Sequence, residues 1–323
     1  MTTEKSGVVC LGILVADVIA RAVDRYPGRG ELTLVDEMHP SIGGCAANTG
    51  IGLAKLGVAT SVMGKVGRDG FGDLVTGVLR DEGLDTRGVA IDKCAYTSAT
   101  MVMIARDGER SFIHHTGANA AFTFDDVDWR LLEEARLLHI AGHFLMPGLD
   151  GLPCAQVLKR AREMGLTTSL DTAWDATERW MDLRPTLAHL NYFVPSFAEA
   201  QRCAQSLNPR ANTPRDVAQV FLDEGVGVVA LKMGEEGSFV KSRDGEWRIP
   251  AFQVRSVDAT GAGDAFAAGF LAGVLNGFDL ETAGKLGNAV GACCVTQVGT
   301  VAGIRSLEET MAFIEEQETA RLK

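Results

Sequence analysis

The sequence lacks long apolar runs, an excess of positive charge, and cysteine pairs at metal-binding or redox spacing. No apolar run approaches the roughly 20 residues that a membrane-spanning helix needs. Lys and Arg number 31 against 42 Asp and Glu, and the net charge of −11 argues against nucleic acid or an anionic membrane as a partner. The seven cysteines include no C-x-x-C pair, so neither a disulfide framework nor a zinc site is expected. Residues 1–7 lack the features of a signal peptide. We therefore expect a cytoplasmic protein with reduced, buried cysteines.

Several common catalytic motifs are also missing. Gly64 and Lys65 are not followed by Ser or Thr, so a P-loop is not indicated. No G-x-G-x-x-G segment follows the first predicted strand, which disfavours a nicotinamide-dependent dehydrogenase. His114 and His115 do not belong to an H-E-x-x-H helix, and their neighbours predict a strand. Because the whole chain is acidic, any anionic ligand must be held by local features.

Strand and helix patterns alternate along the 323 residues, of which 46% are hydrophobic. Strands are predicted at residues 8–14, 60–66, 137–141, 167–170, 192–195 and 227–232. Helices are predicted at residues 46–56, 71–81 and 152–164. Alternation of this kind predicts an α/β fold, with a central, mostly parallel sheet covered by helices on both faces.

Two segments interrupt the alternation. Residues 19–42 and 96–117 carry period-two patterns and turn sequences, without helical periodicity. Together they predict a small β-sheet lid over the carboxyl ends of the parallel strands, where open α/β sheets bind ligands. We expect one domain, residues 1–323, that contains this lid.

Residues 257–266 (VDATGAGDAF) combine a glycine-rich turn with a carboxylate at the start of a predicted helix. The amides of Gly261, Ala262 and Gly263 would be unpaired helix N-terminal donors, aimed where a phosphate can sit. Beside a bound phosphate an ionised Asp264 is repelled, which favours a role for it as the base that takes a proton from an attacking hydroxyl. The alternative is an ordinary helix-capping Asp.

A second group of residues suits a hydroxyl-rich ligand. Gly43 and Gly44 allow a close backbone approach before a helix, and Asn48 offers a donor and an acceptor one turn later. Asp17 follows the first strand and can accept hydrogen bonds from neighbouring hydroxyls. The alternatives are tight packing of the helix, a solvated Asn and a turn Asp.

These segments occur in an order that resembles the ribokinase (PfkB) family of carbohydrate and nucleoside kinases over essentially the whole chain. Residues 43–48 (GGCAAN) resemble the first family signature, and residues 257–266 resemble the second. Between them lie residues 67–72 (GRDGFG), Glu199 in a partial N-x-x-E motif, and residues 232–237 (KMGEEG). The resemblance implies a ribokinase-like fold and ATP-dependent phosphorylation of an alcohol.

The resemblance also implies roles for individual residues. The acceptor would be held by Asp17, Gly43, Gly44 and Asn48. The nucleotide would be contacted by Ser196, Lys232, Gly234, Gly237 and Asn288. Glu199 would organise Mg2+ through water, and K+ would have ligands near Asp258, Thr260 and Gly299. From the residues alone, 232–237 is equally a hairpin turn, and Asn288 and Glu199 are equally polar residues on helix surfaces.

Several positions depart from the family pattern. Ser196 stands where the family usually has Asn, which puts the contacts of the N-x-x-E motif in doubt. Gly142 stands about where ribose-specific members have a Glu that contacts the sugar, and Val15 replaces an Asn near Asp17, so ribose is a less favoured acceptor. Of a D-x-N-x-R pattern only Asp171 is retained, as a candidate for the magnesium water shell.

The sequence therefore predicts an ATP- and Mg2+-dependent carbohydrate kinase that acts on a sugar or sugar-like polyol. Asp264 would be the base, and the amides of Gly261, Ala262 and Gly263 would stabilise the transferring phosphoryl group. A nucleoside kinase of the same fold and a non-catalytic sugar-binding sensor are the alternatives. The resemblance further implies a homodimer formed through the lid, whose strands would otherwise leave an open sheet edge. The sequence does not specify the acceptor or the hydroxyl that is phosphorylated.

Overall fold

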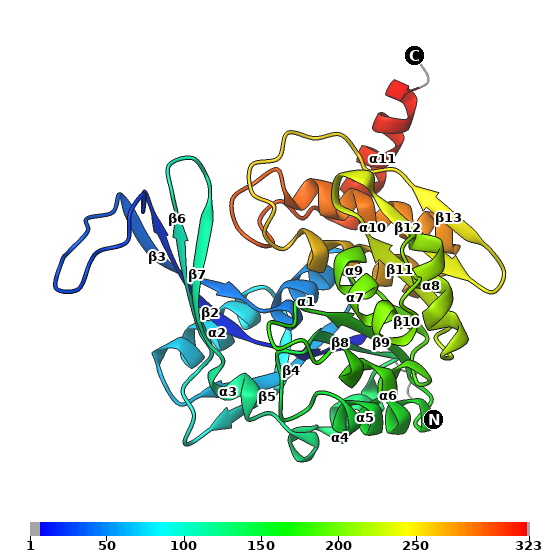
Figure 1. Cartoon of the computed structure of the whole chain (residues 1–323), viewed down its shortest axis with the longest axis horizontal. Coiled ribbons are helices and arrows are strands. Elements are labelled where there is room, and N and C mark those ends of the chain that lie inside the picture. Colours follow the sequence, from blue (N-terminus) through cyan, green and yellow to red (C-terminus); the bar gives the residue numbers. More distant parts are fainter. Residues whose placement is uncertain (1–6, 322–323) are drawn as a thin grey trace.

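The structure, a computed structural model that describes residues 7–321, is built around a nine-stranded sheet (Figure 1). In spatial order its strands are β13 (Glu246–Ile249), β12 (Ser238–Ser242), β11 (Val228–Lys232), β10 (Tyr192–Phe193), β9 (Thr167–Thr172), β8 (Leu137–His143), β1 (Val8–Gly12), β4 (Thr60–Gly67) and β5 (Asp85–Asp92). Neighbouring strands are parallel from β11 to β5, whereas β12 and β13 are antiparallel. The predicted mostly parallel sheet is confirmed.

Helices cover both faces of this sheet, and each face has its own hydrophobic core. On one face pack α1 (Cys45–Lys55), α2 (Gly70–Asp81), α9 (Ala262–Leu275), α10 (Leu280–Cys294) and α11 (Leu307–Arg321). On the other pack α4 (Trp129–Glu134), α5 (Leu152–Glu163), α6 (Arg184–Leu187), α7 (Phe197–Leu207) and α8 (Pro214–Asp223). The remaining short helices are α3 (Gly117–Ala120), η1 (Phe124–Asp126), η2 (Trp180–Leu183) and η3 (Gly234–Glu236).

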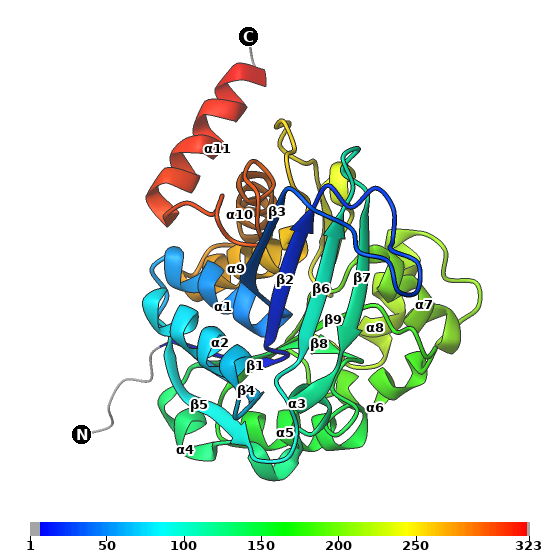
Figure 2. The same cartoon turned by 90° about the vertical axis from the view of Figure 1, so that its left-hand side faces the viewer.

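A second, four-stranded sheet projects from the first, and we call it the lid (Figure 2). Its spatial order is β3 (Glu37–Gly43), β2 (Val15–Arg21), β6 (Ala99–Ile104) and β7 (Arg110–His115). The predicted smaller sheet is confirmed, but β2 begins at Val15 rather than residue 19, and residues 22–36 form no strand. His114 and His115 lie in β7, as their neighbours predict.

The predicted strand over residues 8–14 is two strands in the structure. β1 ends at Gly12, and the chain passes from the large sheet to the lid through Ile13 and Leu14. The side chain of Asn119 bonds both the amide and the carbonyl of Leu14, at 3.1 and 3.0 Å, and so replaces the lost strand pairing. A continuous apolar run does not reveal a change of sheet, because both strands are buried here.

Two further expectations concern membrane-spanning helices and the cysteines. No helix among residues 7–321 combines the length and apolar composition needed to cross a bilayer. All seven cysteines are free, but Cys94 is exposed and Cys45 is half-buried. The expectation of uniformly buried cysteines is therefore wrong for these two.

Candidate active site

The glycine-rich turn before α9 lies at the start of a helix, as the sequence predicts. Gly261 is the residue before the helix and has a left-handed backbone, with φ of 78°. A Cβ at this position would lie 2.3 Å from the carbonyl oxygen of Thr300, so only glycine fits. The first amides of α9 have no acceptor within the helix; that of Ala262 donates to the Ala259 carbonyl oxygen at 3.4 Å, a long hydrogen bond that an anion can replace.

Asp264 stands in the first turn of α9, and its carboxylate faces the start of α1. Asn48 Nδ2 donates a 2.8 Å hydrogen bond to Asp264 Oδ2, and the buried Asn48 Oδ1 has no partner among the described residues. Burial raises the pKa of Asp264, although hydrogen bonds from Asn48 and Cys45 and the charge of Lys232 oppose this. A carboxylate with a raised pKa in a half-buried site is a suitable proton acceptor.

Asp17 projects from lid strand β2 and touches the turn before α1. A Cβ on Gly43 would lie 2.3 Å from Asp17 Oδ2, so the carboxylate occupies the space that this glycine leaves. Burial raises the pKa of Asp17 to about 6, against the effect of a hydrogen bond from Thr100. Gly44 precedes α1, which carries Asn48. The turn thus links Asp17 to Asn48 and Asp264.

A buried ion pair lies on the other side of the turn before α9. Lys232 Nζ, at the end of β11, is 2.5 Å from Asp171 Oδ2, at the end of β9. Burial disfavours the charged form of Lys232, but the carboxylates of Asp171 and Glu199 outweigh it and raise its pKa. A Cβ on Gly263 would lie 3.4 Å from Lys232 Nζ. A positive charge therefore stands beside the amides at the start of α9.

Next to this ion pair opens a cavity of about 490 Å³. Its lining includes Lys232, Gly234, Gly237, Gly263 and Asn288, so most of the predicted nucleotide residues surround one space. Asn288 Nδ2 donates to the carbonyl oxygens at 249 and 250, at 3.0 and 3.2 Å, which fixes this side chain against the end of β13. The cavity lining thus brings the Lys232 side chain together with Gly263, in the first turn of α9.

Ser196 and Glu199 have a structural role in the start of α7. The Ser196 hydroxyl accepts from the Glu199 amide at 3.3 Å, and Glu199 Oε2 accepts from the Ser196 amide at 3.2 Å. This reciprocal capping accounts for both residues without a ligand. Thr172 Oγ1 also donates to Glu199 Oε2, at 3.0 Å, which holds the carboxylate near Asp171. The predicted nucleotide contact of Ser196 and magnesium contact of Glu199 stay predictions.

The region expected to hold K+ is occupied by protein hydrogen-bond donors. Asp258 Oδ1 accepts from the Thr260 amide at 2.8 Å and from Arg110 Nη2 at 2.5 Å. Asp258 Oδ2 accepts from the Gly299 amide at 3.1 Å. Burial works to raise the pKa of Asp258, but these donors together lower it below its ordinary value. The carboxylate is thus ionised, and each of its oxygens already accepts at least one hydrogen bond.

Three features of the site are absent from the sequence predictions. They are the hydrogen bond between Asn48 and Asp264, the proximity of Cys45 to Asp264, and the Arg110–Asp258 ion pair. Cys45 lies inside the GGCAAN segment, and this position could have indicated from the sequence that it belongs to the site. Arg110 follows a turn sequence in the lid, and no local pattern indicates its distant partner.

Comparisons with known proteins match the chain over nearly its whole length. A model of the pfkB family of carbohydrate kinases matches residues 5–307. The ATP-dependent ribose-1-phosphate kinase of Halopiger xanaduensis is 32% identical over 283 residues, covering 88% of this chain and 90% of that protein. The 2-dehydro-3-deoxygluconokinase of Bacillus subtilis is 28% identical over 309 residues, covering 91% and 93%.

A solved structure has the same fold. It is a putative Ribokinase II from E. coli in complex with ATP and Mg2+, with a TM-score of 0.81 and 26% identity. The match covers 96% of this chain and 99% of that chain.

Proposed function

Because the chain belongs to the pfkB family of carbohydrate kinases, we propose that it transfers the γ-phosphoryl group of ATP to a hydroxyl of a sugar or sugar-like polyol. The observation that carries this proposal is Asp264, held by Asn48 at 2.8 Å directly behind the first amides of α9. A base beside an anion-binding helix start is what phosphoryl transfer to an alcohol requires.

In the proposed reaction the oxygen of the acceptor hydroxyl attacks the γ-phosphorus of ATP, and Asp264 accepts the proton of that hydroxyl. The bond from that phosphorus to the bridging oxygen breaks, and ADP leaves. The amides of Gly261, Ala262 and Gly263, with the Lys232 ammonium beside them, stabilise charge on the transferring group. Asn48 orients the Asp264 carboxylate.

The acidic side chains near Lys232 fit a magnesium ion. Asp171 Oδ1 is buried without a hydrogen-bond partner in residues 7–321, and Thr172, the next residue in the chain, donates to Glu199 Oε2 at 3.0 Å. Residues 7–321 contain no group of three or more His, Cys, Asp or Glu that could hold a metal ion directly. Mg2+ keeps several waters and bridges nucleotide phosphates when bound, so it can be held through water. Asp171 and Glu199 would hold its water shell.

The acceptor would lie between Asp17 and Asp264. We expect Asp17→Ala to raise the acceptor KM roughly 10- to 150-fold, because a charge-assisted hydrogen bond is lost. The KM for ATP changes little, since Asp17 lies across the Gly43 turn from the nucleotide cavity. Steady-state kinetics with each substrate varied in turn measure both. Asp36→Ala, at an exposed carboxylate paired with Arg106, is the control. Equal small changes in both KM values would remove Asp17 from the acceptor site.

The raised pKa of Asp17 predicts a pH dependence. Burial raises it to about 6 from 3.8, so the carboxylate becomes protonated as pH falls through 6 and loses its acceptor capacity. We expect the acceptor KM to rise below this pH. The effect on stability has the opposite pH dependence. Asp17 contributes to the stability of the folded protein when it is protonated at low pH, and this contribution is lost as pH rises through 6. An Asp17→Asn variant that keeps the wild-type pH dependence of the acceptor KM would contradict this assignment.

A panel of acceptors tests the proposal and its alternatives. ADP release from ATP and Mg2+ is measured with aldoses, ketoses, sugar acids, sugar phosphates and nucleosides. Turnover with a sugar or polyol supports the proposal, whereas turnover with nucleosides alone favours the nucleoside kinase. A sugar that binds but gives no turnover identifies a sensor. The relatives act on different acceptors by name, which is why the panel must be broad.

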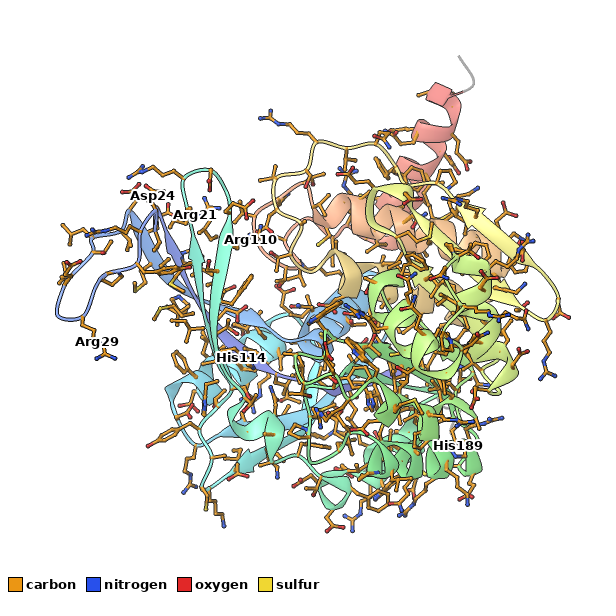
Figure 3. The ribbon with its side chains drawn as sticks, in the orientation of Figure 1. Arg21, Asp24, Arg29, Arg110, His114 and His189 are labelled. Carbon is orange, nitrogen blue, oxygen red and sulfur yellow. The ribbon has the colours of Figure 1, made fainter. Side chains whose placement is uncertain are left out.

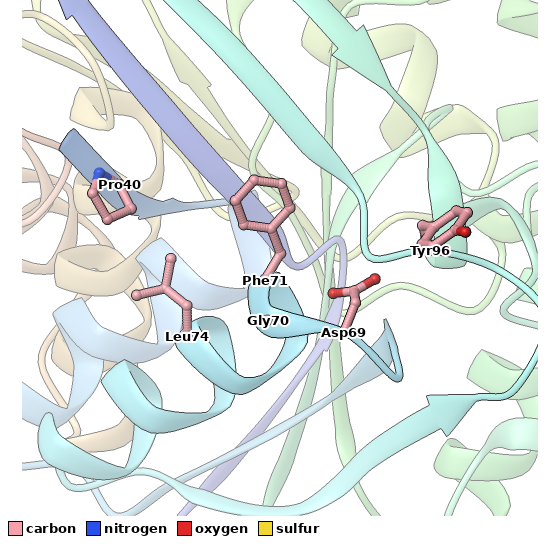
Figure 4. Close-up of a pocket in the computed structure, with 6 residues that line it drawn as sticks. All are labelled: Pro40, Asp69, Gly70, Phe71, Leu74 and Tyr96. Atoms are coloured by element: carbon pink, nitrogen blue, oxygen red, sulfur yellow. The ribbon is translucent and has the colours of Figure 1, made fainter. Parts of the chain in front are cut away.

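We also propose a homodimer formed through the lid. Its outer face exposes Met38, Met101 and Ile113, with exposed fractions of 60%, 42% and 63%. The neighbouring surface holds an apolar pocket of about 560 Å³ between Pro40, Phe71 and Leu74 (Figure 4). Burying these side chains against a second copy would remove them from water and cover the lid edge.

Light scattering during size-exclusion chromatography tests this dimer. We expect about twice the chain mass of 34.4 kDa for the wild type and a monomer for Ile113→Asp. Leu152→Asp, which places the same charge at an exposed leucine of α5, leaves the mass unchanged. A monomeric wild type at working concentration would contradict the proposal.

A further inference from the structure

One ion pair joins the lid to the segment that opens the candidate anion site. Arg110 is the first residue of β7, and Asp258 lies shortly before Gly261. Arg110 Nη2 and Asp258 Oδ1 are 2.5 Å apart, with side-chain exposures of 24% and 9%. Figure 3 shows Arg110 on the side of the lid that faces the rest of the protein. A largely desolvated ion pair therefore joins the lid to the loop before α9.

The surroundings of Asp258 do not suit a metal cation. A carboxylate that ligates a cation must direct lone pairs at it, but here Arg110, Thr260 and Gly299 take up three of its roughly four lone-pair positions. A guanidinium at this distance also repels a second positive charge. The family resemblance implies K+ at this place, and the residues present do not fit it in the observed arrangement.

We propose that the Arg110 guanidinium takes the place of a monovalent cation at Asp258. The arrangement of the amides at the start of α9 then depends on the contact between the lid and the loop that carries Asp258. Arg110 neutralises Asp258, and Asp258 in turn holds the amides of Thr260 and Gly299. Thr300, the residue after Gly299, borders Gly261, whose backbone leaves no room beside the Thr300 carbonyl. Arg110 is a positioning residue that acts through this loop, and its effect on turnover rests on the proposed kinase function.

The orientation of Arg110 within the lid supports this assignment. Arg110 pairs with Ile104 in β6, and Thr100 pairs with both Asp17 and His114. Because side chains alternate along a strand, Arg110 shares a face with His114, Thr100 and Asp17. The lid thus presents the Asp17 carboxylate, which we propose to bind the acceptor, and the Arg110 guanidinium on the same face. Closure over an acceptor would bring both to the site together.

The experiment compares wild type, Arg110→Met, Arg110→Lys and a control, Arg106→Met, in KCl and in tetramethylammonium chloride at equal ionic strength. Arg106 is an exposed lid arginine paired with Asp24 and Asp36 at 3.1 and 3.2 Å. Thermal melting and kcat/KM are both measured. Melting does not depend on turnover, so it tests cation binding even if the kinase proposal fails.

We expect wild type and Arg106→Met to melt and turn over equally in both salts. Arg110→Met should lose roughly 10- to 100-fold in kcat/KM in tetramethylammonium. It should regain part of this loss, and melt at a higher temperature, in K+, because Asp258 is then open to a metal ion. Arg110→Lys, which keeps the charge, should retain more activity than Arg110→Met and respond less to K+.

Two results would overturn the proposal. The first is a wild type that melts at a higher temperature or turns over severalfold faster in K+, because its cation site would then be intact beside Arg110. The second is an Arg110→Met variant that matches Arg106→Met in both salts, because the ion pair would then have no effect on the site.

Discussion

Replacing Asp264 with Asn is expected to lower kcat by roughly 10²- to 10⁴-fold, the range that general base catalysis contributes. Asn keeps the size of the side chain and an oxygen that can accept from Asn48 Nδ2, but it cannot take up the acceptor proton. Folding and ATP binding should be nearly unchanged. The readouts are kcat from ADP release, the Kd for ATP by calorimetry, and the melting temperature.

Asp279→Asn is a matched control for this experiment. Asp279 precedes α10 and caps it by accepting from the Thr282 amide at 2.7 Å, away from the cavity. Its amide variant should keep the wild-type kcat. Gly261 and not Asp264 is the cap residue of α9, and no side chain caps this helix. If Asp264→Asn also turns over at close to the wild-type rate while it folds and binds ATP, then Asp264 is not the base and only pairs with Asn48.

Removing the Lys232 charge is expected to have the next largest effect. Lys232 Nζ lies 2.5 Å from Asp171 and close to Gly263, in the lining of the cavity that we propose for the nucleotide. Lys232→Met should lower kcat by about 10²- to 10³-fold, as the loss of one stabilising donor does in other enzymes. The variant also leaves Asp171 as a buried, unpaired carboxylate, which destabilises the fold.

The chemical and structural effects of this change can be separated. The double variant Lys232→Met/Asp171→Asn removes the unpaired charge and should recover melting temperature, and its kcat should stay below that of Asp171→Asn alone, which accounts for the proposed role of Asp171 near Mg2+. Lys241→Met is the control, because Lys241 is a similarly buried lysine, 14% exposed, paired with Glu246 at 2.8 Å on the neighbouring strand. A double variant with near wild-type kcat would show that Lys232 serves only the structure.

The local parts of the site could be predicted from the sequence. The turn before α9 and the helix itself are encoded in adjacent residues, where glycines followed by an apolar run specify a helix start. Lys232, Gly234 and Gly237, whose segment was expected to lie along the nucleotide, line one cavity, while their contact with a nucleotide stays a prediction. In each case the information lies within a few residues of the site.

The contacts between distant segments could not be predicted in this way. Asn48 and Asp264 are 216 residues apart, and Arg110 and Asp258 are 148 apart. Hydrophobic periodicity defines which face of an element is buried, but not which polar side chain of another element it meets. From the sequence, Ser196 and Glu199 were related only to the N-x-x-E motif of the family. In the structure the same two residues form hydrogen bonds that cap the start of α7.

The central claim, transfer of a phosphoryl group from ATP to a carbohydrate alcohol, is tested most directly by ³¹P NMR of a reaction containing ATP, Mg2+ and the best acceptor of the panel. The account predicts equal amounts of ADP and a new phosphate ester, and neither product with Asp264→Asn over the same time. Inorganic phosphate without an ester, or unchanged ATP in the presence of an acceptor that binds, would contradict it.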